Sequence, residues 1–286
     1  GYIVELDNEI QSSTKSWLKQ FSAKLGEPII RKAIFKAMEI MANQYVLGQT
    51  IDDAISAKTK KSLFSFDMLG EGSRTENDSI NYFEAYSDAI KRIGRFSAPG
   101  KSVEENDGIS VKLSALHNRY EFRHESTVMK KLYQRIKKLC LEAKTFNISL
   151  SLDAEESARL DLAMQIFENL SREPELNGWD GLGFVLQSYL KRAPLVLKWL
   201  DALASETNQK FMIRLVKGAY WDTEIKRAQE KGLKEYPVYT RKVNTDACYH
   251  YCTHLLSLNQ GTLYPQFATH NAYTMALIAE IFKNQN

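Results

Sequence analysis

The chain has 286 residues, of which 44% are hydrophobic and 26% are charged, and its formal net charge is +3. These values are typical of an ordinary globular protein with a large core, and the small, scattered positive charge excludes a strongly basic nucleic-acid-binding surface. The three cysteines, Cys140, Cys248 and Cys252, do not make a secreted disulfide framework, and no apolar run approaches the roughly 20 residues that cross a bilayer.

The first 61 residues are predicted to form a helical segment without strands. From Asp7 onward the apolar side chains recur at three- and four-residue spacing, with a break at the sequence GEP. The chain has no initiator methionine, and its last residues directly follow a predicted helix. We therefore expect it to be a piece of a longer protein.

After Ser62, short β-like runs alternate with amphipathic helical stretches such as 126–144 and 157–171. A strand followed by a helix, repeated along the chain, predicts parallel strands with crossover helices. No linker or low-complexity tract interrupts the series, so residues 62–286 are predicted to form a single domain. The expected strands lie within residues 63–69, 108–116, 147–155, 181–188, 210–218 and 264–271.

Along the expected strands one face is apolar and the other is small or polar. Ile109 and Val111, for example, share one face, while Ser110 and Lys112 share the other. A parallel sheet that is covered by helices on both faces should be apolar on both. We therefore predict an α/β fold of the (βα)8 barrel type, with helices outside, a functional lumen inside, and a site at the carboxyl ends of the strands.

Charged and polar residues gather at the ends of these strands. Two or three cations beside one carboxylate suit an anionic or electron-rich ligand, although each residue alone is often half of a structural ion pair. Arg214 and Lys217 can hold a phosphate or steer a flavin ring, and Gly218 allows a ligand to approach the backbone closely. Tyr220 and Trp221 offer flat surfaces for a ring, with core packing as the alternative. The residues expected to converge on one mouth are Lys112, Asp153, Gln187, Arg214, Lys217, Thr269 and His270.

Three short motifs do not carry a function. Cys248, His250, Cys252 and His254 alternate along an expected helix, which puts the cysteines and the histidines on nearly opposite faces. Such a set cannot close a tetrahedral metal site. The GLGFVLQ stretch lacks the third glycine of a dinucleotide fingerprint, and GEGSRT lacks the ending of a P-loop. The sequence therefore predicts no metal.

Seven stretches resemble the proline dehydrogenase domain of bifunctional proline utilization A proteins. They are FSFDMLGEGSRT, SVKLSALH, LDAEE, FVLQSYLKRA, RLVKGAYWDTEIKRAQ, YPVYTRKVNTD and QFATHNAYT, and they run through almost the whole chain in the order of that family. The resemblance implies a distorted (βα)8 barrel with non-covalent FAD at its mouth. It also implies oxidation of L-proline to 1-pyrroline-5-carboxylate, the first step of proline catabolism, with hydride passing from proline C5 to flavin N5 and electrons passing to a membrane quinone.

The same resemblance implies roles for single residues. Lys112 matches the lysine near the substrate carboxylate, Asp153 the aspartate beside the substrate and flavin, and Arg214 the arginine that hydrogen-bonds the flavin near N5. Tyr220 matches an aromatic residue that shapes the proline site. The positions that match flavin contacts are Asp153, Gln187, Arg214, Val216, Lys217, Gly218, Trp221, Thr240, Lys242, Thr269, His270 and Asn271.

The chain departs from the family pattern at its C-terminus. Six strands are counted, and the Tyr-x-x-Arg-Arg motif that clamps the substrate carboxylate in the family is absent. We therefore expect an incomplete barrel in which Lys112 alone balances the proline carboxylate, with weak binding of FAD and proline by the isolated chain. Two alternatives stay open: a phosphate-handling barrel enzyme such as an aldolase, with Lys112 as a Schiff-base amine, and a non-catalytic barrel fragment.

The resemblance also bears on partners and location. It implies a pyrroline-5-carboxylate dehydrogenase domain in the parent chain, and it allows a DNA-binding module in the parent only, with no nucleic acid for this chain. The small number of cysteines favours a reducing compartment. We therefore expect a cytoplasmic protein that associates peripherally with the membrane when it reduces quinone.

Overall fold

The computed structural model describes residues 27–42, 46–58, 62–98 and 100–284. The chain divides into two compact units, residues 1–60 and residues 61–286, and each is described by itself. The helical pattern predicted ahead of residue 27 lies outside the described residues.

The described part of the first unit is helical, as the sequence predicts. Helix α2 (Glu27–Ala42) begins at the GEP break, where Pro28 occupies the first turn and needs no backbone N–H donor. Helix α3 (Ile51–Ser56) begins with a capping box, in which the Thr50 side chain accepts from Asp53 N and the Asp53 carboxylate accepts from Thr50 N at 3.0 Å. Within residues 27–42 and 46–58 no strand occurs.

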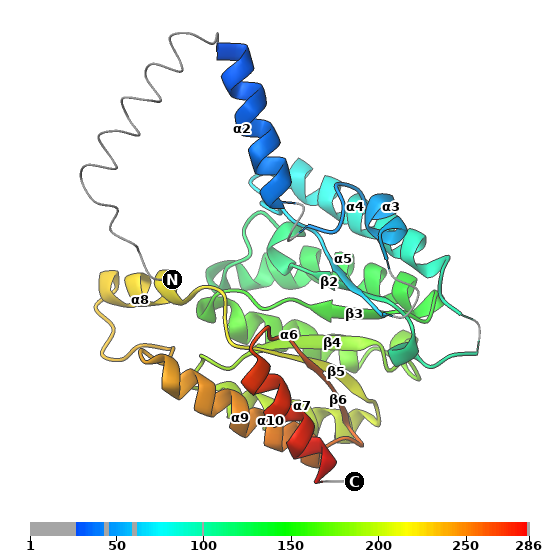
Figure 1. Ribbon diagram of the computed structural model, residues 1–286. Coiled ribbons are helices and arrows are strands. Elements are labelled where there is room, and N and C mark those ends of the chain that lie inside the picture. Colours follow the sequence, from blue (N-terminus) through cyan, green and yellow to red (C-terminus); the bar gives the residue numbers. More distant parts are fainter. Residues whose placement is uncertain (1–26, 43–45, 59–61, 99, 285–286) are drawn as a thin grey trace. The chain divides into compact units, whose positions relative to one another are not determined.

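The second unit is built on one parallel sheet of six strands in the order β1-β2-β3-β4-β5-β6 (Figure 1). Each strand coincides with or overlaps a run that the sequence predicts. Strands that pair in chain order, with helices between them, are typical of a βα barrel. The strands are β1 (Ser65–Asp67), β2 (Gly108–Val111), β3 (Ser149–Leu152), β4 (Leu182–Gln187), β5 (Phe211–Val216) and β6 (Leu263–Phe267).

Helices follow every strand of this sheet, and the predicted stretches 126–144 and 157–171 are both helical. The α-helices are α4 (Glu76–Gly94), α5 (Glu125–Thr145), α6 (Leu160–Ser171), α7 (Ala193–Thr207), α8 (Trp221–Glu230), α9 (Lys242–Leu258) and α10 (Ala272–Lys283). Short 3-10 helices are η1 (Val103–Glu105), η2 (Leu113–Ala115), η3 (Phe122–His124), η4 (Ser157–Arg159) and η5 (Pro174–Leu176).

The apolar faces of the strands pack outward against these helices. Helices α4, α5, α7 and α9 contact β2, β3, β4 and β5, respectively. Ile109 and Val111 of β2 are buried on this face. Phe167 of α6 packs edge-on against Phe184 of β4 and Phe211 of β5, with ring centroids 5.3 and 4.9 Å apart. The hydrophobic core therefore lies between the sheet and the helices, where the alternation of side chains predicts it.

The inner face of the sheet is polar and concave. Arg214 of β5 donates a hydrogen bond of 3.0 Å to Ser110 of β2, and another to Ser65 of β1. In a flat sheet these strands would lie roughly 14 and 19 Å from β5, beyond the reach of one side chain. The sheet is therefore curved into a half-barrel with a lumen, and the predicted barrel-type fold is confirmed. In the described residues β1 and β6 do not pair with each other.

Candidate active site

Charged side chains from three neighbouring strands meet at the carboxyl edge of the sheet. Asp67 is the last residue of β1, and Lys112 and Asp153 are the first residues after β2 and β3. Because the strands are parallel, their carboxyl ends lie side by side, which is where βα barrels build their sites. Asp67, Lys112 and Asp153, which lie on the polar face that the sequence predicts, are therefore neighbours at the carboxyl edge of the sheet.

Lys112 is the centre of this charged cluster. Its Nζ lies 3.2 Å from Asp67 Oδ1, 3.1 Å from Asp153 Oδ2 and 2.8 Å from Glu71 Oε2. Glu71 comes from the loop after β1, and its side chain is only 2% exposed. Its other oxygen, Oε1, is buried without a hydrogen-bond partner in the described part of the chain. Three carboxyl groups thus surround one ammonium group.

This crowding shifts the pKa values of the cluster. Burial raises the pKa of Glu71 to about 7, although the hydrogen bond from Lys112 acts in the opposite direction. Burial also raises the pKa of Asp67, again against the charge of Lys112. Burial by itself would lower the pKa of Lys112, but the hydrogen bond to Glu71 and the charges of Asp153 and Asp67 outweigh it and raise that pKa. Lys112 therefore stays protonated, the opposite of what a Schiff-base amine needs, which argues against the aldolase alternative.

Arg214 is held in a different way. Its guanidinium is half-buried, and the hydroxyl groups of Ser110 and Ser65 accept its hydrogen bonds. Among the described residues, no carboxylate oxygen lies within 4.0 Å of a guanidinium nitrogen of Arg214, so Arg214 forms no ion pair with them. Burial lowers the pKa of Arg214, and the charges of Asp153 and Asp67 act against that shift from a greater distance. A positive charge without a contacting carboxylate attracts an anionic or electron-rich ligand.

The loop after β5 carries Gly218 and Tyr220. Gly218 has a φ of +141°, and a Cβ at this position would lie 2.5 Å from the ring of Tyr189. The sequence predicts that a ligand approaches the Gly218 backbone closely, and in the structure the group that does so is the Tyr189 ring. Tyr220 is half-buried, and burial raises its pKa, with the charges of Glu155 and Asp153 adding to the shift. An aromatic ring therefore stands near the charged cluster.

Gln187 joins two loops of the site. It ends β4 and is 2% exposed. Its Nε2 donates to the Glu155 carbonyl at 2.8 Å, and its Oε1 accepts from the Ala219 N–H at 3.1 Å. The first partner lies in the loop that begins with Asp153 and the second lies beside Tyr220. The side chain of Gln187 therefore fixes the spacing of two loops that carry predicted catalytic residues.

Lys217 and Lys242 form a second cationic group. Each contacts a different oxygen of the Asp246 carboxylate in α9 at 2.6 Å. Two positive charges thus share one negative charge, and the net positive charge suits a phosphate. Trp221 begins α8, is 40% exposed, and donates from Nε1 to the Tyr239 carbonyl at 2.9 Å. The Trp221 ring is therefore anchored by this hydrogen bond and is still accessible to a ligand.

The other predicted cofactor residues lie outside the charged cluster. Val216 ends β5 and is half-buried, and Thr240 is exposed ahead of α9. Thr269, His270 and Asn271 follow β6. Thr269 Oγ1 accepts from Asn271 N at 3.1 Å, the Asn271 side chain caps α10, and His270 is exposed. The structure therefore sets these side chains at the same edge of the sheet without direct contact to Lys112.

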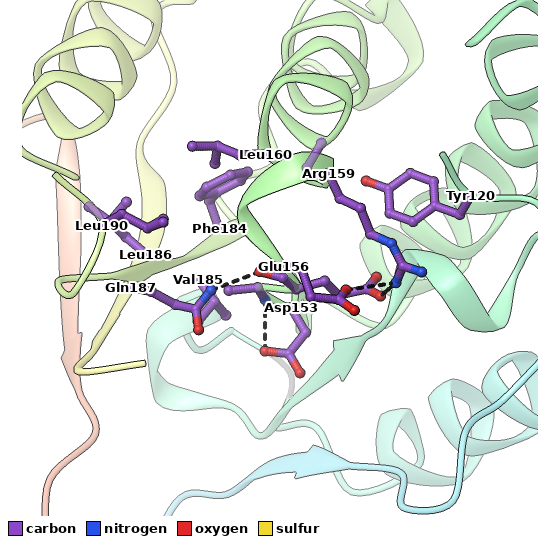
Figure 2. A pocket seen from close by; sticks show the side chains of 13 residues that line it. Tyr120, Asp153, Glu156, Arg159, Leu160, Phe184, Val185, Leu186, Gln187 and Leu190 are labelled. Atoms are coloured by element: carbon purple, nitrogen blue, oxygen red, sulfur yellow. Dashed lines mark hydrogen bonds and ion pairs between the residues drawn. The ribbon is translucent and has the colours of Figure 1, made fainter. Parts of the chain in front are cut away.

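A small cavity lies beside the charged cluster, between the loop after β3 and the end of β4 (Figure 2). Asp153 and Gln187 line it, and its volume of about 20 Å³ holds about one water molecule. Arg159 extends along the opposite wall and pairs with Glu156 at 3.2 Å (Figure 2). The cavity is too small for an amino acid or a flavin.

The cysteines and histidines near residue 250 lie on different faces of α9. Cys248 and Cys252 are buried, while His254 is exposed, as the helical spacing predicts. In the part of the chain that the structure describes, no group of three or more histidine, cysteine, aspartate or glutamate side chains could hold a metal ion. None of the described helices combines the length and the apolar character needed to span a bilayer.

Four residues of the site are not among the predicted site residues: Ser65, Asp67, Glu71 and Ser110. Asp67 and Ser110 stand on polar strand faces, so the alternation that identifies Lys112 carries a signal for them too. Glu71 lies in GEGSRT, whose only signal is its position directly after a strand end. Strand alternation thus finds residues on strands, but not a loop residue that folds back into the cluster.

A parallel half-barrel with a charged cluster at the carboxyl ends of its strands is typical of βα-barrel enzymes. The family model described as proline dehydrogenase matches residues 50–286, and the chain belongs to this family. Bifunctional protein PutA of Escherichia coli is 47% identical over 98% of the chain. Proline dehydrogenase of Deinococcus radiodurans is 27% identical over 68% of the chain and 57% of its own length.

Solved structures share the fold. Proline utilization A from Bradyrhizobium japonicum matches with a TM-score of 0.81 at 45% identity, over 92% of this chain and 27% of that one. Proline utilization A from Bdellovibrio bacteriovorus, inactivated by N-propargylglycine, matches with a TM-score of 0.82 at 28% identity, over 88% and 28%. The chain spans 21% of the length of the Escherichia coli protein. The predicted family resemblance is confirmed.

Proposed function

We propose that this chain supplies the proline dehydrogenase site of a longer protein and oxidises L-proline to 1-pyrroline-5-carboxylate. The observation that carries the proposal is the pair of cations at one mouth, Lys112 among carboxyl groups and Arg214 between hydroxyl groups. Membership of the proline dehydrogenase family supports the same reaction. In this proposal residues 62–286 are the dehydrogenase domain and residues 1–61 are the helical segment that precedes it.

The residues present fit a flavin as cofactor. FAD, when bound, would accept the hydride that leaves proline C5. Arg214 offers a positive charge without a contacting carboxylate, and such a charge near N1 or N5 stabilises the reduced ring. The net positive charge of Lys217, Lys242 and Asp246 suits a diphosphate, and Trp221 offers an accessible ring for stacking. The other proposed FAD contacts are Asp153, Gln187, Val216, Gly218, Thr240, Thr269, His270 and Asn271.

The chain's own residues would orient proline by charge. Lys112 stays protonated at the mouth of the lumen, so it can balance the carboxylate of the substrate. Asp153 and Asp67 hold the Lys112 Nζ in position, and their negative charge would suit the protonated ring nitrogen of proline. Tyr220 would limit the size of the substrate from the β5 side. The reaction breaks the C5–H and N–H bonds and forms a C=N bond, with the nitrogen proton released to solvent.

Other parts of the longer protein would use the product, and a separate acceptor would take the electrons. Relatives such as the Escherichia coli protein are named bifunctional, and the chain covers 21% of that protein. We include in the proposal a pyrroline-5-carboxylate dehydrogenase domain elsewhere in the parent chain, and a quinone at the membrane surface as electron acceptor. The proposed location is the cytoplasm, with peripheral membrane association during quinone reduction.

The test is a flavin spectrum of the longer protein, followed by anaerobic titration with L-proline. We expect a yellow protein whose visible absorbance bleaches with L-proline and stays unchanged with D-proline. A colourless protein that a borohydride trap links to a carbonyl substrate through Lys112 would support the aldolase alternative instead. A protein that loads FAD but never bleaches with L-proline would contradict the proposed reaction and leave the flavin fit standing.

A further inference from the structure

We infer that Ser110 and Ser65 are positioning residues, whose hydroxyl groups hold the Arg214 guanidinium in the lumen as an uncompensated cation aimed at an electron-rich ring. The inference deepens the proposed function and rests on it, because the ring is that of the proposed flavin. Neither serine matches a position that the family resemblance singles out.

The geometry joins strands that lie far apart in the sheet. Arg214 NH1 donates to Ser110 Oγ at 3.0 Å, and Arg214 NH2 donates to Ser65 Oγ. Ser110 is fully buried in β2, so its hydroxyl has no access to bulk water, whereas Ser65 is exposed at the start of β1. Both terminal nitrogens of the guanidinium are thus fixed from the far side of the lumen. Of its five N–H donors, the other three form no hydrogen bond with the described residues and remain for another partner.

The chemistry of the two serines sets the charge of the site. A hydroxyl group satisfies a guanidinium N–H without adding a negative charge, whereas a carboxylate would satisfy the hydrogen bond and cancel the charge. Lys112, at the same mouth, is instead surrounded by carboxylates: it contacts Asp67, Glu71 and Asp153. The site therefore holds one cation, Lys112, among carboxyl groups and the other, Arg214, between neutral hydroxyl groups.

Burial gives this arrangement its energetic consequence. Removing a guanidinium from water without a counter-charge is costly, and the cost is relieved when a ligand brings negative charge to it. Arg214 held rigidly by two hydroxyl groups needs no reorganisation when that charge develops, which is the condition for strong electrostatic stabilisation. A guanidinium free to turn toward Asp153 would lose this property.

The test uses the flavin-loaded protein and substitutions of single hydroxyl groups. Ser110→Ala and Ser65→Ala remove one hydrogen bond each, and Ser65→Thr keeps the hydroxyl as the conservative rescue. Ser151→Ala is the matched control, because Ser151 pairs with Ser110 in register and is 1% exposed. The readouts are the two-electron reduction potential of the bound flavin and its visible spectrum, which a merely structural role would leave unchanged.

We expect Ser110→Ala to weaken stabilisation of the reduced ring roughly tenfold, because a hydrogen bond to a charged group is lost. For a two-electron couple this lowers the potential by about 30 mV. Ser65→Ala should shift it in the same direction, with Ser65→Thr and Ser151→Ala within about 10 mV of the parent protein. Unchanged potentials in both alanine variants, or an equal shift in Ser151→Ala, would overturn the inference.

The design separates the inference from the proposed function. If the protein binds flavin and is reduced by L-proline but the serine variants keep the parent potential, only the inference fails. If the longer protein binds no flavin, the proposed function fails and the inference fails with it. Should Ser110→Ala not fold, the exposed Ser65 still decides the outcome, because its substitution leaves the core intact.

Discussion

Lys112 and Glu71 form a buried pair in which only one of the two carboxylate oxygens is used. Glu71 Oε2 lies 2.8 Å from Lys112 Nζ, while Oε1 has no hydrogen-bond partner among the described residues. A buried carboxylate that is only half satisfied is costly in its charged form. Burial accordingly raises the pKa of Glu71 to about 7, so the proton occupancy of the site depends on pH near neutrality.

Glu71→Gln should change how stability depends on pH. The folded-state pKa of about 7 lies above the ordinary value of 4.5, so between these values the folded protein binds more protons than the unfolded chain. The contribution of Glu71 to the free energy of unfolding therefore falls as pH rises through that window. The variant lacks this fall, so its stability relative to the parent should be higher at pH 8 than at pH 5.

The measurement is urea unfolding of parent and variant at both pH values. Glu84→Gln is the control, because Glu84 is exposed on α4 and its substitution should shift both curves equally. A stability difference between parent and Glu71→Gln that is the same at pH 5 and pH 8 would contradict the prediction.

Lys112→Gln should destabilise the fold as well as the site. Asp67, Glu71 and Asp153 would lose the one ammonium group that contacts all three. Removing one partner of a buried ion pair costs about 3–5 kcal/mol, and since the Lys112 side chain is 20% exposed we expect about 2–3 kcal/mol. The loss should grow with pH, as the carboxyl groups ionise without a counter-charge.

Lys131→Gln is the matched control for this lysine. Lys131 pairs with Glu76 at 3.6 Å, and the two side chains are 52% and 42% exposed. An exposed pair contributes about 0–1 kcal/mol. If denaturant titrations gave the same loss for Lys112→Gln and Lys131→Gln, the cluster would not be the electrostatic unit described above.

The sequence predicts most of the half-barrel and part of the site. Strand alternation identifies the inner face, and the carboxyl ends of parallel strands must meet, so the pattern predicts that Lys112 and Asp153 converge, and the structure adds their 3.1 Å contact. The partners of Arg214 do not follow, because Ser110 and Ser65 lie 104 and 149 residues away and reach it only through the curvature of the sheet. Curvature is a property of the packed helices and strands together, which no single strand encodes.

Gln187→Met should loosen two site loops at once. The substitution leaves the Glu155 carbonyl and the Ala219 N–H without the partners that Gln187 provides at 2.8 and 3.1 Å. Unpaired buried groups cost about 1–3 kcal/mol, and the KM for proline should rise because both loops carry predicted substrate contacts. Gln209→Met is the control, since Gln209 is 8% exposed and its Oε1 has no hydrogen-bond partner in the described residues. Equal stability losses and an unchanged KM would show that Gln187 does not position the loops.

Gly218→Ala should be destabilising for two separable reasons. The backbone at Gly218 has a φ of +141°, which side chains rarely adopt, and the strain costs about 1–3 kcal/mol. The new methyl group would also lie 2.5 Å from the ring of Tyr189, which is 2% exposed, so the ring or the backbone would have to shift. Tyr220 lies two residues after Gly218, so a shift of the backbone or of the Tyr189 ring would also move Tyr220. Proline binding should therefore weaken together with stability.

A double-mutant cycle with Tyr189→Ala separates the two effects. Removing the ring relieves the steric clash but leaves the φ strain, so Gly218→Ala should cost less in the Tyr189→Ala background than in the parent protein. Gly72→Ala is the control, because nothing lies within 4 Å of a Cβ added there, and its effect on the unfolding free energy should stay within about 0.5 kcal/mol. An identical cost in both backgrounds would assign the whole effect to the backbone and rule out the contact with Tyr189 as a reason for glycine at this position.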